Sequence, residues 1–142
     1  MDDTLLKNPR RAGLYYLSPH RQAALRQHLA HSGLKALAAD LSKARSIEEA
    51  LDELGKALEL PDWYGSNFDA LADCLADPDW MPAKGHVILI RGISELRDVA
   101  AASLPTLIDV FRSAAEARRA DGTPFWILLD TPVRGVSPCP EA

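Results

Sequence analysis

Two carboxylates, Asp69 and Asp73, lie four residues apart near the middle of the sequence. In a helix, residues at this spacing project from the same side. Paired carboxylates can act as the acid and the base of a hydrolase, or they can bind cationic side chains of another macromolecule. Two like charges at this spacing cost a helix roughly 0.2–0.5 kcal/mol. Helix stability therefore does not explain the pair.

Aromatic residues directly precede these carboxylates. Residues 60–75 read LPDWYGSNFDALADCL, so Trp63, Tyr64 and a glycine lead into the predicted helix. Exposed aromatic residues beside paired charges are typical of a protein-binding surface. Alternatives stay open: the aromatic rings could pack beneath the loop, and Asp69 could simply suit the positive end of the helix. Asp73 could be a solvated surface charge.

Other candidate chemistry is weakly supported. His28 and His31 are close on a predicted helix, but no cysteine or carboxylate follows at the spacing of a zinc site. Neither a phosphate-binding glycine pattern nor a nucleophile motif is present. Basic residues are scattered rather than interleaved with aromatic ones, which argues against nucleic-acid binding. We expect no metal, no cofactor and no enzymatic activity.

The distribution of charge is uneven. The net charge of the 142 residues is −4, yet residues 46–79 contain ten acidic residues and one lysine. This segment carries −9, which leaves +5 on the rest of the chain. Such asymmetry favours a cationic partner, although a solvated acidic helix face has the same composition.

The elements that position these residues follow from hydrophobic periodicity. We predict strands at residues 13–17, 34–41, 86–90 and 125–129, and helices at residues 18–33, 46–58, 67–76 and 103–119. Ser18-Pro19 and the Ser46/Glu49 pair are helix-start signals. Two of the strands are apolar throughout, which indicates a parallel sheet covered by helices and hence an α/β fold.

Chain length, apolar runs and cysteine content indicate the number of domains and the cellular compartment. The length fits one domain. No apolar run is long enough to cross a membrane, and the N-terminal segment lacks the apolar stretch of a secretory signal. We expect Cys74 and Cys139 to be free thiols in a reducing compartment, the cytoplasm. The prolines of residues 131–142 favour a flexible tail.

Residues 60–75 resemble the barstar family, intracellular inhibitors of the ribonuclease barnase. The shared pattern is Leu-Pro-acidic-aromatic-Tyr-Gly-x-Asn-apolar-Asp-Ala-Leu-x-Asp-Cys-Leu. A weaker resemblance runs from about residue 34 to residue 129, and the family domain is expected at residues 34–130. Ala72 stands where barstar has a tryptophan. The resemblance implies a family domain with three strands. We expect residues 1–33 to add a strand and a helix to the same domain.

This resemblance implies an acidic plug for the cationic active site of a barnase-type ribonuclease or a related basic toxin. The chain would then be the immunity protein of that toxin. Asp69 and Asp73 would bind phosphate-binding cations, with Asp73 dominant, and Trp63 would stack on the catalytic histidine. The implied partner-binding residues are Trp63, Tyr64, Gly65, Asn67, Phe68, Asp69, Asp73 and Trp80. The alternatives are a regulatory module that presents the same face to another basic protein, and a hydrolase that uses Asp69 and Asp73.

Overall fold

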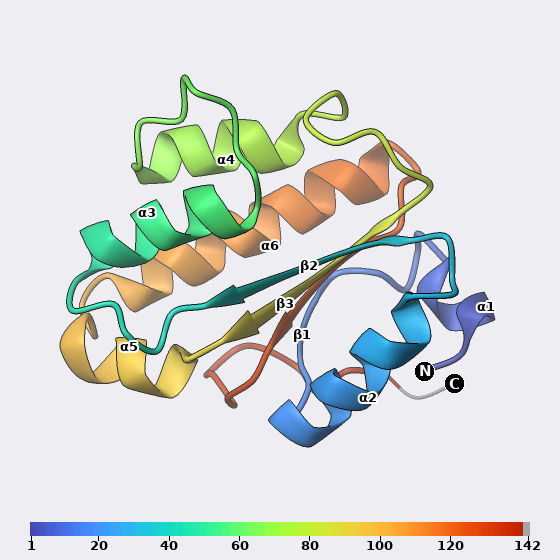
Figure 1. Ribbon diagram of the computed structural model, residues 1–142, viewed down its shortest axis with the longest axis horizontal. Helices are drawn as coiled ribbons and strands as arrows, with labels where there is room; N and C mark the ends of the chain where they lie inside the picture. The colour runs from blue at the N-terminus through green and yellow to red at the C-terminus, as the bar shows by residue number, and fades with distance from the viewer. Residues whose placement is uncertain (141–142) are drawn as a thin grey trace.

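A four-stranded parallel sheet forms the centre of the computed structural model, which describes residues 1–140 (Figure 1). The strands are β1 (Leu14–Tyr16), β2 (Lys35–Asp40), β3 (His86–Arg91) and β4 (Phe125–Leu129). Their order across the sheet is β1-β4-β3-β2, and every neighbouring pair is parallel. Parallel neighbours need long crossover connections, which the helices provide. The predicted α/β fold, including the additional N-terminal strand, is confirmed.

Six helices occur within residues 1–140. They are α1 (Asp3–Leu6), α2 (Pro19–Leu29), α3 (Ile47–Ala57), α4 (Phe68–Ala76), α5 (Ile93–Val99) and α6 (Leu104–Ala120). α1 and α5 were not predicted, because four and seven residues are too few to establish a helical period. In this part of the chain no helix has the length and hydropathy required to cross a membrane.

Local capping explains where α2 and α3 begin. Ser18 precedes α2 and accepts a hydrogen bond from the Arg21 backbone N–H at 3.4 Å. Ser46 precedes α3 and accepts one from the Glu49 N–H at 3.2 Å. The Glu49 carboxylate, however, accepts from the backbone N–H of Arg45 at 3.2 Å rather than from Ser46. The predicted capping box is therefore formed on the serine side only.

Each face of the sheet has its own hydrophobic core. α3, α4 and α6 lie on one side, and α1 and α2 lie on the other (Figure 1). Side chains alternate along each strand, so successive residues of β3 and β4 point to opposite cores. The first core receives Ile88, Ile90, Ile127 and Leu129, and the second receives Val87, Leu89, Trp126 and Leu128. Residues 1–33 supply β1 and the helices of the second core.

Residues 137–139, part of the segment that we expected to form a flexible tail, lie beside Tyr16 of β1. The Tyr16 N–H donates to the Ser137 carbonyl at 2.8 Å, and the Cys139 N–H donates to the Tyr16 carbonyl at 2.8 Å. Cys139 is buried, and neither it nor Cys74 forms a disulfide. These contacts cover the outer edge of β1, which would otherwise expose unpaired backbone groups. The end of the predicted tail, residues 141–142, lies outside the described residues.

Candidate partner-binding site

The helix that carries the paired carboxylates begins at Asn67. The side-chain oxygen of Asn67 accepts a hydrogen bond from the Ala70 N–H at 2.8 Å. Asparagine is among the best residues for this position because its oxygen satisfies an N–H group that has no partner within the helix. Asn67, one of the predicted binding residues, therefore fixes the start and direction of α4.

Asp69 and Asp73 are both exposed on α4, whereas Leu71, Cys74 and Leu75 are buried. The spacing of four residues places the two carboxylates on the same side of the helix. Within residues 1–140 neither carboxylate has an ion-pair or hydrogen-bond partner, since the salt bridges found there join other residues. Both carboxylates are thus available to a cation from outside.

The charges near the C-terminal end of α4 oppose the stability of the helix, whereas Asp69 lies in the favourable first turn. Asp73 lies toward the C-terminal end of the helix, Asp77 is the residue that ends it, and the last turn has no basic residue. The C-terminal end of a helix carries partial negative charge, so a carboxylate there costs about 0.3–1 kcal/mol. Helix formation alone therefore does not explain why carboxylates occupy these positions. Binding of a cation would offset the cost.

The two aromatic residues of the loop between α3 and α4 have different surroundings. Trp63 is 58% exposed. Tyr64 is half-buried: its hydroxyl donates to the Leu51 carbonyl of α3 at 2.8 Å, and its ring lies on Gly55. Burial raises the pKa of Tyr64 to about 12. Tyr64 therefore anchors the loop on α3, and Trp63 faces solvent.

Gly65 and Phe68 complete the segment. Gly65 is exposed, and a Cβ at this position would lie 3.0 Å from Nδ2 of Asn67. The contact is with the end of the Asn67 side chain, and the residue of this turn with a positive φ is Ser66, at 52°. Phe68 is half-buried and packs against the first core. Phe68 therefore supports the helix from below more than it extends the exposed surface.

Trp80 lies in the segment that follows α4 and is also half-buried. Its indole ring stacks on the ring of His86, with centroids 5.6 Å apart and an interplanar angle of 23°. His86 is buried, and its Nε2 lies 2.6 Å from the Met81 carbonyl oxygen. Burial is the main cause that lowers the pKa of His86. Trp80 and Trp63, distant in sequence, border the same cleft.

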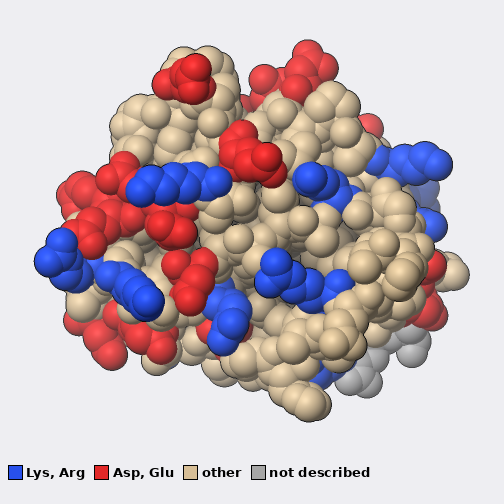
Figure 2. Space-filling model, viewed as in Figure 1, with Lys and Arg blue, Asp and Glu red and all other residues tan. Residues whose placement is uncertain are grey.

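Acidic side chains gather over α3 and the α3–α4 loop, where Figure 2 shows them on the upper and left parts of the surface. The exposed acids of α3 include Glu48 and Asp52. Arg45 lies among them and pairs with Glu49, whose pKa it lowers through a side-chain hydrogen bond. The acidic segment of the sequence is thus an acidic region of the folded surface.

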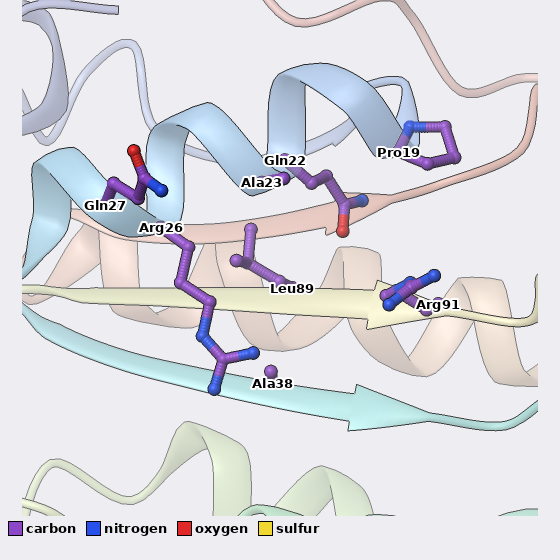
Figure 3. Close-up of a pocket in the computed structure, with 8 residues that line it drawn as sticks. All are labelled: Pro19, Gln22, Ala23, Arg26, Gln27, Ala38, Leu89 and Arg91. Atoms are coloured by element: carbon purple, nitrogen blue, oxygen red, sulfur yellow. The ribbon is translucent and has the colours of Figure 1, made fainter.

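A groove of about 490 Å³ lies on the opposite face of the sheet, between α2 and strands β2 and β3 (Figure 3). Its lining includes Gln22, Arg26 and Arg91. Nε2 of Gln22 donates to the carbonyl oxygens of Leu17 and Leu128, both at 3.1 Å. This amide therefore ties α2 to the sheet. The groove is bordered by cations and lies away from the acidic α4 surface.

The geometry does not favour the two alternative sites considered from the sequence, a metal site and a hydrolase site. Nε2 of His28 lies 2.6 Å from a carboxylate oxygen of Asp3, while His31 is exposed. Among the described residues, no three His, Cys, Asp or Glu side chains form a group that could hold a metal ion. Acid–base catalysis by two carboxylates relies on surroundings that differ between them. Asp69 and Asp73 are both exposed, an arrangement that suits binding better than catalysis.

The family model described as Barstar (barnase inhibitor) matches residues 34–130, more than half of the chain. The match runs from β2 to the residue after β4 and includes α4 with both carboxylates. The strand β1 and the helices α1 and α2 lie before the matched residues.

Proposed function

The chain belongs to the barstar family, and we propose that it inhibits a barnase-type ribonuclease by covering the active site with α4 and the α3–α4 loop. It acts by occlusion, without turnover, metal or cofactor. Its setting is the cytoplasm, where it serves as the immunity protein against a ribonuclease or a related basic toxin.

The observation that carries this proposal is the pair Asp69 and Asp73, exposed and unpaired on one side of α4 beside the exposed Trp63. A ribonuclease holds the phosphates of its substrate with cationic side chains. Carboxylates form charge-assisted hydrogen bonds with such groups, often two at once with arginine. The acidic field around them also accelerates encounter with a basic protein.

The other predicted residues have supporting roles in this proposal. Trp63 stacks on the catalytic histidine of the ribonuclease. Tyr64 and Asn67 hold the loop and the start of α4 in the binding geometry, through their contacts with α3 and with the Ala70 N–H. Gly65 and Trp80 contribute to the surface near the two carboxylates, and Phe68 supports α4 from the side of the first core.

The test is inhibition of a panel of barnase-type ribonucleases at low and high salt by the wild type and by Asp73→Ala. We expect inhibition of at least one member, weaker at high salt, and strongly reduced in Asp73→Ala. The matched control is Glu48→Gln, which removes an exposed acidic charge from α3 and should leave inhibition nearly unchanged. Inhibition of no member, together with binding of a different basic protein through α4, would instead support the regulatory module.

A further inference from the structure

A cleft of about 350 Å³ lies between the α3–α4 loop and the segment that follows α4. Trp63 and Trp80 both border it. The Trp80 ring stacks on the ring of His86, with centroids 5.6 Å apart, which holds its orientation at the edge of the cleft. Trp63 is 58% exposed, and exposed tryptophan rings often contribute much of the affinity at protein-binding surfaces.

Three carboxylates also border this cleft, those of Glu59, Asp77 and Asp79. The Asp79 N–H donates to the Asp77 carboxylate at 2.8 Å, which fixes the turn after α4. Asp77 follows Asp73 by four residues, so the acidic row that begins at Asp69 extends toward the cleft. The cleft therefore combines aromatic walls with negative charge.

The buried side chain of Arg118 lies beneath the end of α4, next to the cleft. Arg118 donates to the carbonyl oxygens of Leu75 and Asp77, both at 3.4 Å. Its guanidinium also lies over the Phe125 ring, 5.0 Å from the centroid. Arg118 is only 2% exposed, and its charge interacts with that of Asp77, whereas Glu59 and Asp79 are exposed. The opening remains rich in acceptors for an external cation.

We propose that this cleft receives an arginine side chain of the partner protein, in addition to the cations that meet Asp69 and Asp73. The inference rests on the proposed function for the identity of the partner, but its chemistry depends only on the cleft. A guanidinium is planar and stacks on indole rings, while its edge donates several hydrogen bonds to carboxylates. A lysine ammonium offers no flat surface for the two tryptophans, so arginine fits these walls better.

A direct test uses the three tryptophan indole N–H signals in NMR spectra of the ¹⁵N-labelled full chain. The probes are N-acetyl-arginine amide and N-acetyl-citrulline amide, which have similar shapes but differ in charge. We expect the Trp63 signal to shift with the arginine probe and several-fold less with the citrulline probe. The indole N–H of Trp80 is buried, so its signal should shift in the same way but less than that of Trp63. The Trp126 signal is an internal control, because its N–H is buried and donates to the Leu6 carbonyl at 2.9 Å. Equal responses to the two probes, or none, would overturn the inference.

A double variant, Asp77→Asn with Asp79→Asn, removes two charges from the cleft and keeps a side-chain oxygen at each position. It should lose the arginine-dependent shifts. The matched control, Glu48→Gln with Glu53→Gln, removes two charges from α3 and should keep them. Loss of the shifts in both variants would show that the probe senses overall charge rather than the cleft.

Inhibition measurements separate this inference from the proposed function. If the cleft is occupied in the complex, the Asp77/Asp79 variant should dissociate from the ribonuclease about tenfold faster, at high salt as well as low salt. The α3 control should change only the association rate, and salt should remove that effect. Inhibition lost in Asp73→Ala but retained in the cleft variant would leave the proposed function intact and reject the cleft. Arginine-dependent shifts without inhibition of any ribonuclease would support an arginine-binding cleft and reject the proposed function.

Discussion

The ring of Tyr64 lies on the backbone of α3 at Gly55, so closely that a Cβ on Gly55 would stand 2.6 Å from Cε2 of the tyrosine. A glycine inside a helix costs about 1 kcal/mol relative to alanine. Here it gives the ring room to approach the helix and to bring its hydroxyl within 2.8 Å of the Leu51 carbonyl. The contact holds the α3–α4 loop in place, with the neighbouring Trp63 exposed.

Gly55→Ala should therefore destabilise the protein, although alanine is the better helix former. We expect a loss of about 1–3 kcal/mol in the free energy of unfolding, as for other overpacked sites. Urea denaturation measures this loss. Lys56→Ala, at an exposed position of the same helix, is the control and should be nearly neutral. A Gly55→Ala protein more stable than the wild type would mean that the ring contact imposes no constraint.

Tyr64→Phe should cost about 1 kcal/mol at neutral pH, because it removes the hydrogen bond to Leu51. The pKa of Tyr64 is raised to about 12, so the folded protein keeps a proton that the unfolded chain releases near pH 10. The free energy of unfolding of the wild type should then fall as the pH rises from about 10 to about 12. Unfolding at several alkaline pH values should show a smaller fall in Tyr64→Phe.

Asp73→Ala should leave the fold intact and raise the free energy of unfolding slightly, by about 0.3–1 kcal/mol. The substitution removes a charge that repels Asp69 and opposes the helix dipole. Its inhibition constant for a target ribonuclease should nevertheless rise at least about tenfold, since a charged bonding partner is lost. Thermal denaturation and inhibition assays on one preparation measure both quantities. Melting of the variant with unchanged binding would show that this side of α4 has been misassigned.

His86 should make stability depend on pH in the weakly acidic range. Burial is the main cause that lowers its pKa, opposed by the bond to the Met81 carbonyl. Below about pH 6.5 the unfolded chain takes up a proton at this residue that the folded protein does not, so the free energy of unfolding falls as the pH falls. His86→Gln should flatten this fall between about pH 5 and 7. His20→Gln, at an exposed histidine, should leave it unchanged.

Leu25→Ala tests whether residues 1–33 fold with the rest of the chain. Leu25 of α2 is buried in the second core, beside residues of β3 and β4. We expect a loss of about 2–5 kcal/mol in the free energy of unfolding. The transitions seen by circular dichroism and by tryptophan fluorescence should coincide. Arg26→Ala, one residue further at an exposed position, is the control. Two separate transitions would indicate that residues 1–33 unfold independently.

Secondary structure was predictable wherever the signals are local. The hydrophobic period placed α4 and its exposed carboxylates, and serine caps marked the starts of α2 and α3. α5 was not predictable in this way. Its first N–H groups are bound by Asp130, which accepts from Gly92 at 2.9 Å and from Ile93 at 3.3 Å. Asp130 follows β4, far from α5 in the sequence. The residues next to α5 therefore contain no signal that predicts this cap.

The sequence by itself determined the α/β class, the order of the main elements and the motif that identifies the family. It did so because helical phase, capping and strand hydrophobicity depend on residues near one another in the chain. Only the tertiary structure decided that Tyr64 is an anchor while Trp63 is exposed, and that Trp80 borders the same cleft as Trp63. It also placed residues 137–139 beside Tyr16 of β1. These properties depend on packing between distant segments, which composition and periodicity do not encode.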